Sequence, residues 1–269
     1  MEARNIATAA LDAELLLAHA LGIERFKLFT TSPIITLNTR DKFDDYIRRR
    51  EQLEPIAQIL GEKEFWGLDF KVNSSVLIPR PETELIIELS CKCLPDKEAH
   101  ISILDLGTGS GCIAISLLKE FKQATAIAVD ISSLALALAK ENAERHQVSS
   151  RLELLQGSWF DGLPARTFDL IVSNPPYIGV DETLAAEVVN YEPHIALFAE
   201  NNGLAAYAQI AAGLGNFMHS NSLAIFEVGA KQADDVTNIF SANNIEVVEI
   251  AKDLAGHKRA LVCKKISPR

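Results

Sequence analysis

The sequence predicts an α/β protein in which a seven-stranded, mostly parallel sheet follows a small helical region. Three observations support this fold class. Apolar residues recur at helical spacing near the N-terminus, an aromatic and partly alternating stretch follows, and strand-like runs then alternate with helix-like runs. Such alternation is typical of a sheet with helices on both faces, because parallel strands need long crossover connections.

The N-terminal region, residues 1–62, is expected to form a small helical bundle. One apolar helical face is formed by Ile6, Ala10, Ala13, Leu17 and Leu21, and a second by Phe43, Tyr46, Ile47 and Leu53. Gly22 follows the first face as a stop signal. Pro55 is expected to open a short turn that ends at Gly61.

Residues 63–80 are expected to form a β-hairpin that links this bundle to the rest of the chain. The run 64–72 is aromatic and partly alternating, the run 73–75 is polar, and the run 76–78 is again apolar. Pro81 can occupy the first turn of the helix that follows, so we expect the second domain to comprise residues 81–269.

The second domain contains the alternating runs. The strand-like runs are residues 101–106, 125–129, 152–155, 168–172, 223–228, 245–250 and 259–263, and the helix-like segments are 112–121, 134–144, 204–214 and 233–240. Residues 253–258 leave no room for a crossover helix between the last two strands, which should therefore pair antiparallel.

Charge and residue usage narrow the possible functions. The 269 residues carry 26 Lys and Arg against 36 Asp and Glu, a formal net charge of −10. Duplex DNA is bound through basic surface, so direct nucleic-acid binding is not expected, and the three arginines at 48–50 are expected to form a solvated helix face. The four cysteines and six histidines lack the spacing of a metal site. Because no signal-peptide pattern or membrane-length apolar run is present, we expect a cytoplasmic protein.

The tetrapeptide Asn174-Pro175-Pro176-Tyr177 follows the fourth strand-like run. The two prolines stiffen the loop and donate no N–H, which leaves its carbonyl groups free to face a ligand. The Asn174 amide offers an acceptor and donors, and Tyr177 adds a flat ring. Together these groups suit a planar group that carries an NH2, although Asn-Pro is also ordinary in a turn that ends a strand.

A glycine-rich turn follows the first strand-like run and consists of Gly107, Thr108, Gly109, Ser110 and Gly111. Alternating glycines let the backbone approach a ligand beside the free N–H groups of a helix start. The spacing is G-x-G-x-G, whereas a dinucleotide site has G-x-G-x-x-G and a P-loop ends in G-K-[ST]. The turn therefore suits a ligand that has no pyrophosphate.

Asp130 ends the second strand-like run, where an acidic side chain can accept hydrogen bonds from both hydroxyls of a ribose. We favour this role over a part in starting the next helix, which Ser132 or Ser133 could cap. Trp159 follows the third run and could contact an adenine or pack in the core; both interpretations stay open. A ribose-bearing cofactor without a pyrophosphate, beside a socket for an NH2, indicates S-adenosylmethionine and methyl transfer to nitrogen.

These motifs together resemble those of the bacterial release factor glutamine methyltransferases. The resemblance rests on Ile78-Pro79-Arg80-Pro81-Glu82-Thr83-Glu84, the glycine turn, Asp130 and the 174–177 loop, and it covers nearly the whole chain. It implies a seven-stranded, Rossmann-like class I S-adenosylmethionine methyltransferase domain behind a helical domain that helps to grip the substrate. It also implies methylation of the side-chain nitrogen N5 of the glutamine in the Gly-Gly-Gln motif of peptide chain release factors 1 and 2. We expect a monomer.

The resemblance assigns residues 107–111, Asp130 and Trp159 to the cofactor and residues 174–177 to the glutamine, with Asn174 beside both. An amide nitrogen is a poor nucleophile and only weakly acidic, so we expect catalysis by positioning. The Asn174 oxygen and the Pro175 carbonyl would each accept one glutamine N–H, and Tyr177 would pack on the amide. Ser158 stands where the family often has Asp, which leaves the adenine contacts open. Arg80 could brace the linker or touch the substrate.

Three other functions stay open from the sequence. Adenine-N6 methyltransferases of DNA or RNA share Asn-Pro-Pro-Tyr, but this acidic chain shows no basic groove. A ribosomal-protein glutamine N5-methyltransferase is closer, although the Pro-Arg-Pro-Glu-Thr stretch resembles the release-factor branch. A non-enzymatic scaffold that binds the cofactor would not need the intact 174–177 loop.

Overall fold

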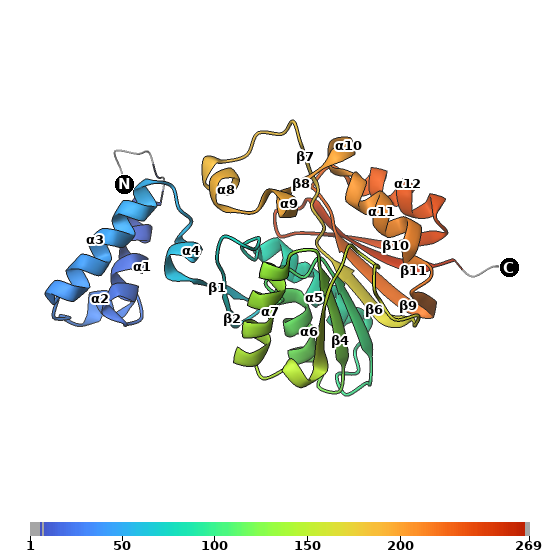
Figure 1. The fold of residues 1–269 in the computed structure, drawn as a ribbon, viewed down its shortest axis with the longest axis horizontal. Coiled ribbons are helices and arrows are strands. Elements are labelled where there is room, and N and C mark those ends of the chain that lie inside the picture. The colour runs from blue at the N-terminus through green and yellow to red at the C-terminus, as the bar shows by residue number, and fades with distance from the viewer. Residues whose placement is uncertain (1–5, 7, 267–269) are drawn as a thin grey trace.

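The computed structural model describes residue 6 and residues 8–266. Helices at the N-terminus are followed by a short hairpin and by an α/β region built on a seven-stranded sheet (Figure 1). None of the helices in the described part has both the length and the apolar character that crossing a membrane requires.

The described part of the N-terminal region contains four helices: α1 Ala9–Leu21, α2 Lys27–Thr30, α3 Leu37–Glu51 and α4 Ile56–Leu60. Helix α1 ends, as expected, at Gly22, which adopts a φ of 67° that glycine tolerates without strain. The expectation of a plain turn from Pro55 to Gly61 was wrong, because Pro55 immediately precedes the helix α4, a position that its fixed φ suits. Arg50 also departs from the expected solvated face: it is buried and donates to Asp12 at 2.7 Å.

The hairpin lies earlier in the chain than expected. Strands β1 Glu62–Phe65 and β2 Leu68–Lys71 pair antiparallel, and the turn between them is Trp66-Gly67, with φ values of 52° and 71°. Positive φ at both central positions matches the twist of a two-residue hairpin. Residues 73–78 form no strand; the Asn73 side chain instead accepts from the backbone N–H of Ser75 in a local turn.

The seven-stranded sheet confirms the predicted fold class. Its strands are β3 Ser102–Leu106, β4 Thr125–Asp130, β5 Leu152–Gln156, β6 Phe168–Ser173, β9 Met218–Glu227, β10 Ile245–Lys252 and β11 Lys258–Lys265, in the order β10-β11-β9-β6-β3-β4-β5. The pairs among β9, β6, β3, β4 and β5 are parallel, whereas β10–β11 and β11–β9 are antiparallel. The antiparallel pairing of the last two strands was expected from their short connection.

Helices cover both faces of this sheet, as Figure 1 shows. One face packs on α5 Glu84–Cys93, α6 Cys112–Glu120 and α7 Ser133–Arg145, and the other on α11 Ala205–Leu214 and α12 Ala233–Ala242. The two apolar cores contain mainly aliphatic side chains of the strands, which are buried on both sides as parallel strands usually are.

A segment between β6 and α11 was not expected from the sequence. It contains β7 Ile178–Gly179, α8 Ala186–Tyr191, α9 His194–Leu197, β8 Phe198–Ala199 and α10 Glu200–Gly203. Strands β7 and β8 pair parallel, and α8 lies on the side of the N-terminal helices (Figure 1). The segment thus begins at the Asn-Pro-Pro-Tyr loop and extends to the helical region.

Candidate active site

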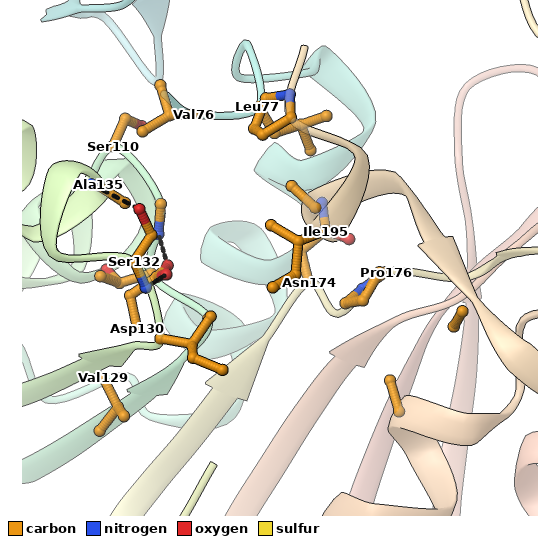
Figure 2. Close-up of a pocket in the computed structure, with 18 of the residues that line it drawn as sticks. Val76, Leu77, Ser110, Val129, Asp130, Ser132, Ala135, Asn174, Pro176 and Ile195 are labelled. Carbon is orange, nitrogen blue, oxygen red and sulfur yellow. Dashed lines mark hydrogen bonds between the residues drawn. The ribbon is translucent and has the colours of Figure 1, made fainter. Parts of the chain in front are cut away.

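A cavity of about 360 Å³ lies at the carboxyl ends of the parallel strands. Open α/β sheets bind ligands at this edge, and a cavity of this size is typical of small-molecule sites. Most residues predicted for the cofactor and the substrate line it: Gly107, Thr108, Gly109, Ser110, Asp130, Trp159, Asn174 and Pro176. Gly111, Pro175 and Tyr177 are not among the lining residues. Figure 2 shows Asp130 and Ser132 on one side of the cavity and Asn174, Pro176 and Ile195 on the other.

The glycine turn between β3 and α6 forms one wall. Gly107, Gly109 and Gly111 all have positive φ, between 56° and 81°. The place that a Cβ on Gly109 would occupy has no other atom within 4 Å, so the backbone there is open. At Gly111 a Cβ would lie 2.9 Å from Ile115 and 3.2 Å from Ala139, so this glycine allows α6 and α7 to approach each other.

Two buried polar atoms near this turn have no hydrogen-bond partner among the described residues, Oγ of Ser110 and Oδ1 of Asp105. The other carboxylate oxygen of Asp105 accepts from the Thr108 hydroxyl at 2.6 Å. Burial raises the pKa of Asp105 to about 7. Ser110 lines the cavity, so a polar ligand there would satisfy a group that the protein leaves unpaired.

Asp130 stands at the end of β4 with both carboxylate oxygens held by backbone N–H groups. Oδ2 accepts from Gly109 at 2.8 Å and Oδ1 accepts from Ser132 at 2.9 Å. The cap of α7 is the Ser132 side chain, which accepts from Ala135 at 3.2 Å. Asp130 is therefore not needed as that cap, and each oxygen retains a lone pair for a ligand.

Trp159 combines features of both interpretations drawn from the sequence. It lines the cavity, where it lies within 3.8 Å of the place of a Cβ on Gly107, and it also packs against the core beneath α11. Its Nε1 donates to Oε1 of Gln209 at 2.6 Å, which fixes the plane of the ring. Ser158 lines the cavity beside it.

The Asn174 amide is fixed by a partner that the sequence did not reveal. Its Nδ2 donates to Oγ1 of Thr83 at 3.0 Å, and the Thr83 hydroxyl donates to Oε2 of Glu227 at 2.6 Å. Glu227 ends β9 and accepts a second hydrogen bond from the Tyr177 hydroxyl at 3.0 Å. Tyr177 is thus directed to Glu227, and burial raises the pKa of this phenol.

The segment after the loop is anchored to the linker and to the helical region. Glu192 accepts from Arg80 and from the backbone N–H of Ile78, so the arginine braces the linker while also lining the cavity. Arg50 donates to Glu187 of α8 at 3.0 Å, and Gln58 donates to the carbonyl of Tyr191 at 2.8 Å. These contacts join the helical region to the chain that carries the Asn-Pro-Pro-Tyr loop.

The described residues contain no group of three or more His, Cys, Asp or Glu side chains placed to hold a metal ion. The arrangement instead offers a backbone cradle, a carboxylate and an oriented amide around one cavity. Such groups can bind and orient a ligand.

Comparison with known proteins gives concordant results for both parts of the chain. The PrmC N-terminal domain model matches residues 1–61, and the methyltransferase small domain model matches residues 85–191. A methyltransferase from Pyrococcus furiosus has a TM-score of 0.56 at 16% identity, covering 83% of this chain and 100% of that one, and therefore shares the fold.

Two kinds of curated relative match at about equal identity. A bifunctional methyltransferase of Rickettsia typhi is 41% identical over 96% of this chain but 53% of its own length, so the chain spans about half of such relatives. A release factor glutamine methyltransferase of Cereibacter sphaeroides is 42% identical over 96% of this chain and 92% of its own length. On this near full-length match, the chain belongs to the release factor glutamine methyltransferase family.

Proposed function

We propose that this chain transfers a methyl group from S-adenosylmethionine to the side-chain nitrogen N5 of the glutamine in the Gly-Gly-Gln motif of peptide chain release factors 1 and 2. The observation that carries the proposal is the Asn174 amide, fixed in the cavity wall opposite Asp130 and the glycine turn. The names of the full-length relatives supply the substrate class.

The residues around the cavity fit S-adenosylmethionine. The open backbone at Gly109 and the unpaired Ser110 hydroxyl suit a small polar ligand held close to the turn. Asp130 has lone pairs for the two ribose hydroxyls, and the ring of Trp159 forms a flat apolar wall for the adenine. When bound, the cofactor supplies an electrophilic methyl group attached to a sulfonium sulfur. The sulfur is already a good leaving group.

The protein then acts on the glutamine by orientation. Oδ1 of Asn174 and the carbonyl of Pro175 would each accept one N–H of the substrate amide, which directs the nitrogen toward the methyl group. Both oxygens also stabilise positive charge as it develops on that nitrogen during transfer, and a proton is then released to solvent. Pro176 would limit sideways movement of the planar amide, and Tyr177 stiffens the loop through Glu227.

We also propose that the helical region, residues 1–62, contacts the release factor. The support is its connection to the catalytic loop through Arg50–Glu187 and Gln58–Tyr191. A partner bound on these helices would lie next to the segment that follows the Asn-Pro-Pro-Tyr loop.

The test is incubation with S-adenosylmethionine carrying a labelled methyl group and, in separate reactions, a release factor, a ribosomal-protein preparation, DNA and RNA. The proposal expects label on the release factor alone. Label on an adenine, or on a ribosomal protein with none on the release factor, would replace the proposed substrate.

A further inference from the structure

We propose that Thr83 and Glu227 are positioning residues that determine which atom of the Asn174 amide faces the cavity. The inference rests on the proposed function, since it concerns how that site presents an acceptor to a substrate N–H. Neither residue belongs to the Asn-Pro-Pro-Tyr loop: Thr83 lies 91 positions and Glu227 53 positions away from Asn174.

The three side chains form one continuous chain of hydrogen bonds. Asn174 Nδ2 lies 3.0 Å from Thr83 Oγ1, which lies 2.6 Å from Glu227 Oε2. Thr83 is 3% and Glu227 1% exposed, so both side chains are largely shielded from solvent, although Thr83 also lines the cavity. Buried polar chains of this kind are well ordered when every member is satisfied.

The donor and acceptor in each of these hydrogen bonds follow from the number of protons available. Thr83 has a single hydroxyl proton, and it donates this proton to Oε2 of Glu227. The Thr83 oxygen can then only accept from Asn174, which forces the NH2 of that amide toward Thr83. The amide oxygen consequently points to the other side, where Asn174 lines the cavity.

The surroundings of Glu227 act on its pKa in opposite directions. Burial raises its pKa, while the hydroxyls of Thr83 and Tyr177 and the charge of Arg259 oppose that rise. Oε2 of Glu227 accepts from the Thr83 hydroxyl and Oε1 accepts from the Tyr177 hydroxyl, so both oxygens act as acceptors.

Without these hydrogen bonds, the two ends of the Asn174 amide are nearly equivalent in shape, and nothing selects one orientation. A reversed amide would present its NH2 to the NH2 of the substrate, donor facing donor, and the substrate nitrogen would lose one of its two acceptors. We therefore expect the chemical step to slow while the cofactor wall, formed by other residues, is unaffected.

The test compares Thr83→Val with Thr83→Ser. Valine keeps the shape and removes the hydroxyl, and we expect kcat on the release factor to fall by about tenfold or more. The KM and the calorimetric Kd for S-adenosylmethionine should stay within about twofold. Thr83→Ser restores the hydroxyl and should recover most of the lost kcat. Thr237→Val, which removes a hydroxyl bonded to the carbonyl of Ala233 in α12, serves as the matched control.

A second measurement is independent of the substrate. In protein labelled with ¹⁵N-asparagine, the Asn174 side-chain NH2, assigned by its loss in Asn174→Ala, should exchange slowly in the wild type and faster in Thr83→Val. Unchanged exchange would contradict the inference, as would equal kcat values for the Val and Ser variants. If the wild type transfers no methyl to the release factor, the proposed function fails, but the exchange measurement still decides whether Thr83 orients Asn174.

Discussion

Asn174 Nδ2 donates to Thr83 Oγ1 at 3.0 Å and thereby ties the Asn-Pro-Pro-Tyr loop to the turn that begins α5. The Pro-Arg-Pro-Glu-Thr stretch and the loop, distant in sequence, thus form one unit. Rotation of the Asn174 amide would break this partly buried hydrogen bond, so the amide holds one orientation without a substrate. The proposed catalysis by positioning requires a fixed amide of this kind.

Replacing Asn174 with Ala should reduce methyl transfer by about 100-fold or more, because it removes one of the two groups that we propose stabilise charge on the substrate nitrogen. Affinity for S-adenosylmethionine should change little, since the glycine turn and Asp130 remain. Turnover and calorimetry measure the two effects separately. Asn221→Ala, at an exposed position of β9, is the control, and near-normal turnover of Asn174→Ala would refute the assigned role.

Replacing Asp130 with Ala should weaken S-adenosylmethionine binding by about tenfold to 100-fold. This range corresponds to the free energy that a hydrogen bond to a charged acceptor usually contributes. The carboxylate holds Gly109 at 2.8 Å, so its loss also loosens the turn that faces the ligand. Asp234→Ala removes an exposed carboxylate of α12 and should bind normally. Unchanged calorimetric affinity in Asp130→Ala would leave Asp130 with a structural role only.

Asp12→Ala should lower the free energy of unfolding by about 3 kcal/mol, because it removes a partner of the buried Arg50 guanidinium. Asp45→Ala removes a partner of the exposed Arg48 and should cost no more than about 0.5 kcal/mol. Urea unfolding of the two variants gives both values. Equal effects would show that the Arg50 pair is not coupled to the stability of the helical region.

The stability of the protein should depend on pH through Asp105. Burial raises its folded pKa to about 7, above the ordinary value of about 4, so the folded state binds this proton more tightly than the unfolded chain. The protonated Asp105 therefore makes its full contribution to the free energy of unfolding at about pH 4, and this contribution is lost as the pH rises to about 7. Asp105→Asn, neutral throughout, should gain stability relative to the wild type over that interval. A difference in unfolding free energy that does not vary with pH would contradict this.

The local patterns predicted much of the fold. Alternating runs located the seven strands, and the short connection before Arg259 correctly indicated an antiparallel last pair. The hairpin was misplaced because its turn uses Trp66, a residue that rarely has positive φ, whereas the polar residues 73–75 look more like a turn. Local composition does not indicate a backbone conformation that the surrounding structure imposes.

The candidate site was only partly predictable for the same reason. Glycines, Asp130 and Asn174 stand at strand ends, where the chain order itself brings them together. Thr83 and Glu227 belong to other elements, 144 positions apart, and only the folded sheet joins them to Asn174. The Glu192–Arg80 pair is likewise a contact between distant segments, which periodicity cannot indicate.

Tandem mass spectrometry of a release factor, after incubation with the enzyme and S-adenosylmethionine, shows which atom receives the methyl group. We expect one added methyl group on the side chain of the Gly-Gly-Gln glutamine, and none on a release factor in which that glutamine is replaced by alanine. A methyl group on another residue of the release factor, or equal methylation of the alanine variant, would contradict this expectation.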